Sequence, residues 1–381
     1  MHKHPLVVFA MWACPAVALA GGYFHTSGNQ ILDAEGRPAS LNGVSWFGLE
    51  TKDRVPHGLW QRSLDSYLDQ LKGLGYNLLR IPWSDDIFKP LAPGRKLNIN
   101  YSENPELKEL TPLQVLDKLV EKAGQRGIKI LLDRHRPDEN AQSELWYTAT
   151  VSETTWIEHW KALAVRYRTN ATVIGADLHN EPHGKATWGS GDEKTDWRLA
   201  AERAGNAVLS IQSNWLIVVE GVGRVGNDSY WWGGNLLGVA SHPVRLKVPQ
   251  RVVYSPHDYG PGVSGQQWFN DADFPKNLVA VWDKHWGYIH RQGLAPVLVG
   301  EFGGRAVDAS AETDPMRKKE AVWQNALVDY IRDNRMYWTY WCWNPNSGDT
   351  GGVLKDDWAT VNQPKQNMLN RLIRKGVSPA N

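Results

Sequence analysis

The sequence has 381 residues, with 42 Lys and Arg against 41 Asp and Glu, which gives a formal net charge of +1. A balance this close to neutral argues against a protein that binds nucleic acid or an anionic membrane, since both need a basic surface. Hydrophobic residues make up 42% and charged residues 22%, which is typical of a globular chain. Tryptophan is unusually frequent, with 20 residues against 7 Phe. So many flat aromatic side chains indicate a surface that stacks against a ligand.

The first 20 residues have the pattern of a secretory signal peptide. A cationic start containing Lys3 precedes an uncharged stretch, Leu6–Ala20, which ends in the small residues that a signal peptidase requires. This stretch is too short to span a bilayer. A buried N-terminal helix is the alternative, but two prolines disfavour it. We therefore expect residues 1–20 to be removed and the protein to be secreted from the cell, with retention in the periplasm as an open alternative.

The next segment, Tyr23–Pro38, contains two turn signals, Ser27-Gly28-Asn29 and Glu35-Gly36. Short runs on either side of closely spaced turns are typical of a β-hairpin. We expect this hairpin to cover the N-terminal face of the domain that follows it.

Short apolar runs then alternate with amphipathic helical patterns to the end of the chain. Continuous runs rich in β-branched residues are typical of parallel strands that are covered on both faces. One helical pattern starts at Thr111, a good N-cap residue, has Pro112 in its first turn and ends at Gly127. The predicted strands are Leu41–Phe47, Asn77–Trp83, Ile128–Asp133, Val173–Asn180, Trp215–Glu220, Arg251–His257, Pro296–Glu301 and Tyr337–Trp343.

Eight strand–helix units in about 360 residues match a closed (β/α)₈ barrel of the α/β class. A doubly wound open sheet is the structural alternative, but it usually needs fewer strands and a nucleotide-binding turn. No linker rich in Pro, Ser or Thr is present. We therefore predict one catalytic barrel domain, residues 21–381, whose bottom is closed by the N-terminal hairpin.

Polar and aromatic side chains gather at the carboxyl ends of the predicted strands, where barrel enzymes carry their sites. Two of these side chains, Glu181 and Glu301, follow roughly opposite strands and suit glycoside hydrolysis, which needs one protonated and one ionised carboxyl group. Pro182 keeps Glu181 out of helical geometry. Glu220 and Asp133 are also eligible by position, and each glutamate could instead pair with an arginine at the barrel rim.

Several separated motifs then carry a resemblance to a known family. Leu178-His179-Asn180-Glu181-Pro182 and Val299-Gly300-Glu301-Phe302-Gly303 resemble the two catalytic segments of family 5 glycoside hydrolases. Asp133-Arg134-His135-Arg136-Pro137 and Ser255-Pro256-His257-Asp258-Tyr259 are similar to further segments of that family. The likeness is strongest to its bacterial cellulases, the endo-β-1,4-glucanases, and it covers essentially all of residues 22–375.

The resemblance implies a role for each matching residue. Glu181 would be the general acid/base and Glu301 the nucleophile of a retaining, double-displacement mechanism. Asn180 would bind the 2-hydroxyl group of the reacting sugar. Arg80 and Tyr259 would donate hydrogen bonds to Glu301, and His257 would orient Glu181. His135 would form part of the polar floor of the site. The aromatic platforms for sugar would be Trp341, Trp46 and Trp232.

The mechanism also leads to an electrostatic expectation. The acid must keep its proton and the nucleophile must lose its own, so we expect a raised pKa at Glu181 and a lowered pKa at Glu301. A cation near Glu301 and a drier setting for Glu181 would separate the two values in that direction.

Two other motifs suggest a bound group but lack the context for one. Gly221–Gly226 has the spacing of a dinucleotide fingerprint, yet no helix pattern follows it. His179 and His183 have zinc-site spacing, yet Pro182 interrupts the helix that such a site needs. We expect no metal and no cofactor. We expect a monomer that acts on a polysaccharide such as β-glucan. It should not bind nucleic acid and, after signal cleavage, should not bind a membrane. A mannanase, a xylanase, a xyloglucanase and a non-catalytic glycan-binding protein remain as alternatives.

Overall fold

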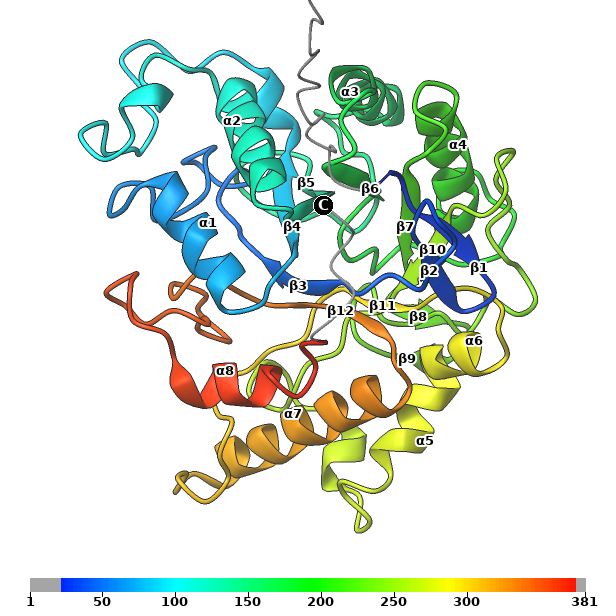
Figure 1. Cartoon of the computed structure of the whole chain (residues 1–381). Coiled ribbons are helices and arrows are strands. Elements are labelled where there is room, and N and C mark those ends of the chain that lie inside the picture. Colours follow the sequence, from blue (N-terminus) through cyan, green and yellow to red (C-terminus); the bar gives the residue numbers. More distant parts are fainter. Residues whose placement is uncertain (1–21, 375–381) are drawn as a thin grey trace, which may run out of the picture.

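A computed structural model describes residues 22–374 of the chain (Figure 1). The predicted signal peptide, residues 1–20, lies outside the described residues. Within residues 22–374, none of the helices combines the length and the apolar character that crossing a membrane requires.

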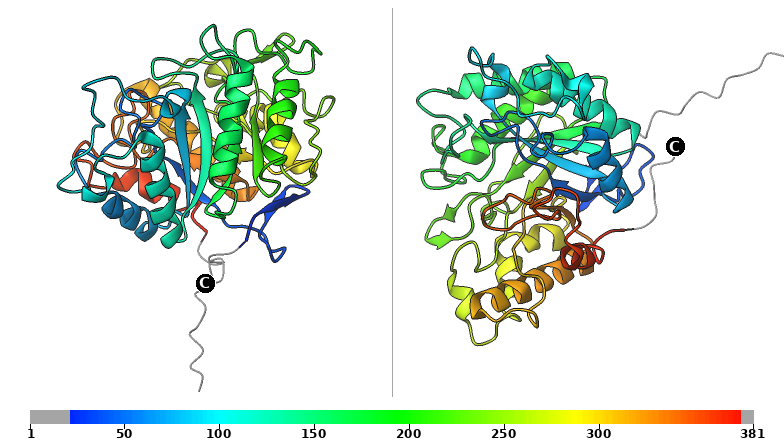
Figure 2. Two further views of the ribbon diagram at one scale, coloured as in Figure 1. Left: turned by 90° about the horizontal axis from the view of Figure 1, so that it is seen from above. Right: turned by 90° about the vertical axis from the view of Figure 1, so that its left-hand side faces the viewer.

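Eight parallel strands form the centre of the molecule, with helices around them (Figures 1 and 2). Isolated bridges between Tyr254 and Val297 and between His257 and Glu301 join the two edges of the sheet, so the barrel closes. The predicted (β/α)₈ barrel is confirmed and the open-sheet alternative is excluded. The strands are β3 (Asn42–Ser45), β4 (Leu78–Ser84), β5 (Lys129–Arg136), β6 (Val173–Asp177), β7 (Leu216–Glu220), β10 (Val252–Ser255), β11 (Leu298–Val299) and β12 (Tyr337–Tyr340), in the spatial order β10-β7-β6-β5-β4-β3-β12-β11.

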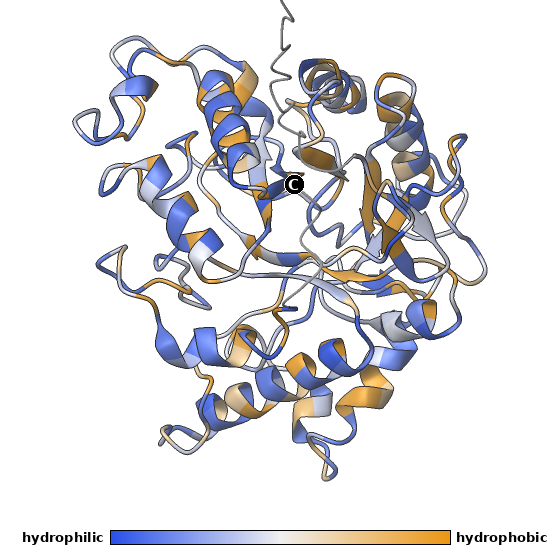
Figure 3. Ribbon diagram, in the orientation of Figure 1, coloured by the Kyte–Doolittle hydropathy of each residue, from blue (hydrophilic) through white to orange (hydrophobic). Residues whose placement is uncertain are grey.

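The helices begin where the sequence provides caps. Thr111 and Gln114 form a reciprocal capping box at the start of α2, and Ser152 accepts a backbone N–H of α3. Figure 3 shows hydrophilic and hydrophobic residues mixed along the outer helices, because one side of each helix packs on the barrel and the other meets solvent. The helices are α1 (Leu64–Gly73), α2 (Pro112–Gln125), α3 (Glu153–Arg166), α4 (Trp197–Leu209), α5 (Leu278–Trp282), α6 (Tyr288–Arg291), α7 (Pro315–Asp333) and α8 (Gln363–Leu369).

The N-terminal hairpin, β1 (His25–Ser27) and β2 (Gln30–Leu32), covers one end of the barrel, as predicted (Figure 2, dark blue). Ile31 is fully buried, and its backbone exchanges two hydrogen bonds with the Tyr337 hydroxyl at the start of β12. Together with residues near the starts of the strands, the hairpin forms an apolar cluster: Phe24, Ile31, Ala39, Leu41, Leu78, Leu131, Ile174, Leu216, Val218, Val253, Leu298 and Tyr337. The bottom of the barrel is therefore dry, and the open end is the carboxyl end of the strands.

Candidate active site

Glu181 and Glu301 face each other across the open end of the barrel. Glu301 follows β11, and its backbone pairs with His257 and Asp258 beyond β10. Glu181 lies beyond β6 on the other side of the site. One carboxylate oxygen of each glutamate and a ring nitrogen of His257 all lie within 4.8 Å of one another. The structure thus brings the two predicted carboxyl groups together.

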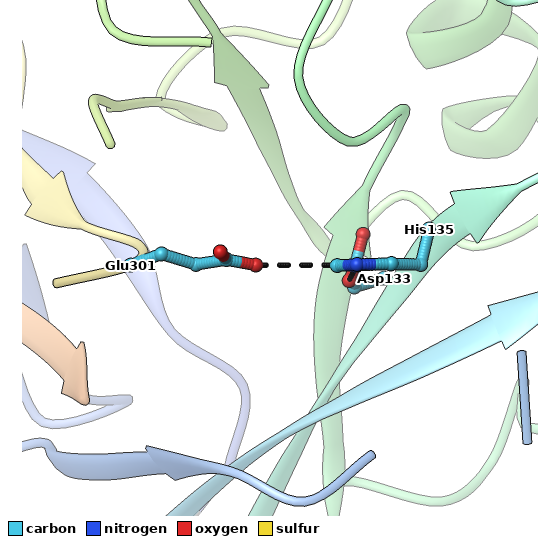
Figure 4. A group of neighbouring side chains, drawn as sticks. All are labelled: Asp133, His135 and Glu301. Carbon is cyan, nitrogen blue, oxygen red and sulfur yellow. Dashed lines mark hydrogen bonds and ion pairs between the residues drawn. The ribbon is translucent and has the colours of Figure 1, made fainter. Parts of the chain in front are cut away.

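Glu301 is held by donors on both of its oxygens. Arg80 NH1 lies 2.5 Å from Oε1, and the Tyr259 hydroxyl donates to Oε2 at 2.6 Å. Burial raises the pKa of Tyr259 well above its usual value, so the phenol keeps the proton that it donates. His135 on β5 approaches from the far side, with Nδ1 3.9 Å from Oε1 (Figure 4). A cation and a phenol therefore hold both oxygens of Glu301 and fix its orientation.

Arg80 is a fully buried guanidinium surrounded by acceptors. Besides Glu301 it contacts Asp133, Asp177 and Glu220 at 2.9 to 3.1 Å. It also donates to Asn180 Oδ1 at 3.0 Å. Burial raises the pKa values of Asp133 and Asp177 to about 7, although the charge of Arg80 opposes the shift.

Glu181 has an unusual backbone, with φ at +52° directly before Pro182. Hydrogen bonds hold this left-handed conformation from both sides: the N–H of Glu181 donates to Glu220 at 2.7 Å, and its carbonyl accepts from His183 Nδ1 at 2.6 Å. The carboxyl group pairs with His257 Nδ1 at 3.0 Å, and Gln142 donates to its other oxygen at 3.3 Å. The predicted break in helical geometry at Glu181 is present, and it aims the carboxyl group into the site.

The expected raised pKa of Glu181 is not found. Burial acts to raise it, but the hydrogen bond and charge of His257 outweigh burial and leave the pKa below the usual value. The prediction was wrong because it considered the dryness of the site without the histidine that pairs with this carboxyl group. In the free protein the proton is favoured on His257.

A cleft of about 640 Å³ opens above the two glutamates. Trp341 lines it and stacks on His135, with ring centroids 5.3 Å apart and planes 7° apart. Trp232, also on the cleft, is 50% exposed and stacks on His183 at 3.7 Å. Both predicted platforms therefore offer an aromatic face at the cleft, with hydrogen-bonding groups around it, as sugar recognition requires.

The assignment of Trp46 to the cleft was wrong. Its side chain is fully buried, and its indole N–H donates to the carbonyl of His57 at 2.9 Å. The next residue, Phe47, lines the cleft instead and stacks on Trp341 at 5.5 Å. Successive side chains of an extended segment point in opposite directions. Only one of these two neighbours can reach the cleft, and the sequence does not say which.

The family model for the cellulases, glycosyl hydrolase family 5, matches residues 32–347 of the chain. The chain belongs to this family. The match runs from the N-terminal hairpin to the loop after β12, so it includes every barrel strand and both glutamates. It confirms the resemblance that the separated motifs predict.

Several family 5 relatives are similar over most of the chain. An endoglucanase of Paenibacillus polymyxa is 61% identical over 362 residues, which cover 94% of this chain and 89% of the relative. The major extracellular endoglucanase of Xanthomonas campestris has a solved catalytic domain that is 42% identical, with a TM-score of 0.85 over 92% of this chain and 99% of that one. An endocellulase from Pyrococcus horikoshii, solved as a complex with cellotetraose, is 41% identical, with a TM-score of 0.85 over 93% and 99% of the two chains.

One group of side chains that could bind a metal lies beside Glu301. Asp133, His135 and Glu301 bring ligand atoms within 4.8 Å of one another (Figure 4). His135 Nδ1, however, pairs with Asp133 at 2.7 Å, and Arg80 contacts both carboxylates. Burial lowers the pKa of His135 to about 4, so its ring is neutral near neutral pH.

The two motifs that suggested a bound group have structural roles. Gly221–Gly226 leads into the small hairpin of β8 (Arg224–Val225) and β9 (Asp228–Ser229), so no helix N-terminus is available for a pyrophosphate. His179 is fully buried with Nδ1 3.0 Å from Arg134 NH1, whereas His183 lies under Trp232. The two histidines do not share a site.

Sequence reasoning named Glu220 only as eligible and missed Gln142 and His183. All three contact Glu181, through its backbone or its carboxyl group. The position of Glu220 at the end of β7 was the available signal, because that strand neighbours β6 in the barrel. For Gln142 and His183, which lie in loops, no comparable pattern exists.

Proposed function

We propose that the chain is a secreted endo-β-1,4-glucanase that cleaves internal bonds of cellulose or a related β-glucan with retention of anomeric configuration. The separation of the two carboxyl groups carries this proposal. Oxygens of Glu181 and Glu301 lie within 4.8 Å, which fits the carboxyl separation of about 5 to 5.5 Å in retaining enzymes. Inverting enzymes need about 6.5 to 9.5 Å, because a water molecule must enter between sugar and base.

In the first step Glu301 attacks the anomeric carbon while a proton from the Glu181 carboxyl passes to the leaving glycosidic oxygen. Arg80 and Tyr259 contact the two oxygens of Glu301 and orient the carboxylate for this attack. In the second step Glu181 accepts a proton from water, and that water attacks the same carbon and frees Glu301.

Asn180 supports this mechanism through a free donor. Its Oδ1 accepts from Arg80, and its buried Nδ2 has no hydrogen-bond partner among residues 22–374. A buried unpaired donor costs free energy unless a ligand pairs with it. We assign Nδ2 to the 2-hydroxyl group of the reacting sugar, where the contact strengthens in the transition state.

The aromatic groups suit a glucan chain. Trp341 would stack under the reacting sugar, and Trp232 would stack against a glucose unit on the far side of Glu181. Phe47 takes the role of aromatic platform that we predicted for Trp46 from the sequence. The similar proteins favour a β-1,4-glucan as substrate over mannan or xylan. They are an endoglucanase from Paenibacillus, an extracellular endoglucanase from Xanthomonas and an endocellulase from Pyrococcus. The signal-peptide pattern of residues 1–20 and the extracellular Xanthomonas relative support secretion.

Glu301→Gln tests the assignment of the nucleophile. The substitution keeps shape and removes the attacking anion, so kcat on carboxymethylcellulose should fall by roughly 10⁴-fold or more, while binding of cello-oligosaccharides survives. Glu320→Gln is the matched control, because Glu320 is a buried glutamate that binds the backbone of Ala306 instead. Near-wild-type turnover in Glu301→Gln would contradict the proposal. Reducing-sugar assays on glucan, mannan, xylan and xyloglucan test the substrate class.

A further inference from the structure

Glu220, the last residue of β7, is a fully buried carboxylate that contacts the backbone of Glu181 and the ring of His257. Its Oε2 accepts the backbone N–H of Glu181 at 2.7 Å. Its Oε1 lies 3.3 Å from His257 Nε2 and 3.1 Å from Arg80 NH2. One side chain therefore meets the backbone of Glu181 and the histidine that pairs with the Glu181 carboxyl group.

His257 lies between two carboxylates, one on each ring nitrogen. Nδ1 is 3.0 Å from Glu181 Oε1, and Nε2 is 3.3 Å from Glu220 Oε1. The contact at Nδ1 is a hydrogen bond, whereas the contact at Nε2 is an ion pair without hydrogen-bond geometry, so it is the positive charge of an imidazolium that both carboxylates attract. The ring is fully buried, so water cannot replace either partner. The arrangement favours an imidazolium held between two acids.

Gly233 packs closely against the carboxylate of Glu220. Gly233 has φ at +67°, and a Cβ there would lie 2.4 Å from Glu220 Oε2 and 3.1 Å from the Cα of Glu181. Only glycine permits this close approach. The carboxylate is therefore enclosed between the loop that carries Trp232 and the left-handed peptide of Glu181.

We propose that Glu220 is a positioning residue that acts through His257: it stabilises the imidazolium whose proton Glu181 uses, and it fixes the backbone of Glu181. This inference rests on the assignment of Glu181 as the acid/base. Before glycosidic cleavage, the His257 Nδ1–H bond breaks and an O–H bond forms on Glu181, which leaves a neutral imidazole and a carboxylic acid. Glu181 then gives a proton to the leaving oxygen while Glu301 attacks. In the second step Glu181 takes a proton from the attacking water, and that proton returns to His257 Nδ1, which restores the imidazolium and the Glu181 carboxylate.

The charges around the ring support a stored proton. Burial acts to lower the pKa of His257, but Glu220 and Glu301 raise it well above its usual value. Burial likewise raises the pKa of Glu220 well above its usual value, although His257 opposes the shift. In this coupled pair the proton is favoured on the ring, because the negative charges of Glu220 and Glu301 stabilise the imidazolium. The charged and titratable groups in the surrounding cluster are Arg80 on β4, Asp133 and His135 on β5, Asp177 and Glu181 at the end of β6, Glu220 on β7, Tyr259 beyond β10 and Glu301 beyond β11.

Glu220→Gln tests the inference in the pH profile of kcat/KM. The amide oxygen can still accept the N–H of Glu181, but the charge that stabilises the imidazolium is gone. The alkaline limb should therefore move to lower pH by roughly one unit or more. Glu320→Gln is the matched control, because Glu320 is a buried glutamate that accepts the backbone N–H of Ala306 and makes no ion pair with His257 in the described structure. An unmoved limb in Glu220→Gln, or an equal shift in both variants, would overturn the inference.

A second measurement is made on the wild-type protein and does not depend on whether Glu220→Gln folds. In the wild-type protein with ¹⁵N-labelled histidine, the His257 ring, assigned by comparison with His257→Gln, should have both nitrogens protonated at pH 7. A ring with one protonated nitrogen at that pH would overturn the inference. Failure of the proposed function has a different signature: Glu181→Gln would then keep wild-type turnover, whereas failure of this inference leaves Glu181→Gln inactive and the Glu220→Gln limb unmoved.

Discussion

The two ends of the barrel are built from the same strands and contrast in chemistry. At the N-terminal end, the strands contribute an apolar cluster that includes Tyr337, and the hairpin of β1 and β2 packs against it. At the carboxyl end, β4, β5, β6 and β7 contribute Arg80, Asp133, Asp177 and Glu220, all fully buried. The closed end gains stability from apolar burial. The open end buries charges that must pair with one another, and it thereby acquires fixed hydrogen bonds for catalysis.

Removal of Arg80 should damage the open end most. Arg80→Met leaves several buried carboxylates without their shared cation, which costs roughly 3–5 kcal/mol in the free energy of unfolding. It also frees Glu301 from its orienting donor, so kcat should fall steeply. Urea unfolding and assays on carboxymethylcellulose measure the two effects. Wild-type stability in this variant would mean that Arg80 does not hold the buried acids together.

A cavity at the closed end should affect stability alone. Ile31→Ala removes a fully buried side chain from the hairpin, at a cost of roughly 2–4 kcal/mol in the free energy of unfolding. The cleft lies at the other end of the strands, so kcat and KM should stay at wild-type values at temperatures where the variant is folded. A large change in kcat would show that the two ends are not independent.

Two tryptophans near the open end should respond in opposite ways. Trp232→Ala removes a half-exposed platform, so KM for cello-oligosaccharides should rise several-fold while stability changes by less than about 0.5 kcal/mol. Trp46→Phe loses a buried hydrogen bond and should cost about 1 kcal/mol in stability without raising KM. If Trp46→Phe raised KM and Trp232→Ala did not, our correction of the Trp46 assignment would be wrong.

The buried acids should make the stability of the open end depend on pH. The pKa of Asp177 is about 7 in the folded protein, against 3.8 for the free group, so the fold favours its protonated form. Its contribution to stability is present below about pH 4 and is lost as pH rises toward 7. Asp177→Asn should therefore gain stability relative to wild type as pH rises from 4 to 8. Thermal unfolding across this range measures the difference, and a constant difference would contradict the shift.

The fold and the proximity of Glu181 and Glu301 could be predicted because both follow from patterns along the chain. Eight buried runs specify the barrel, and barrel topology then brings the strand ends that carry Glu181 and Glu301 to one edge. The choice between Trp46 and Phe47 could not be predicted, because it depends on which way an irregular segment turns its side chains after β3. The pKa of Glu181 depends on His257, which reaches it from beyond β10, and such a neighbour has no signature within one segment.

In the proposed mechanism, Glu301 forms a covalent bond to the sugar while Glu181 serves first as acid and then as base. Proton NMR of cello-oligosaccharide hydrolysis tests this most directly, since it reports the anomeric configuration of the first product before mutarotation. Two displacements predict that the new reducing end appears first as the β-anomer. A first product in the α configuration would mean a single displacement by water and would contradict the account.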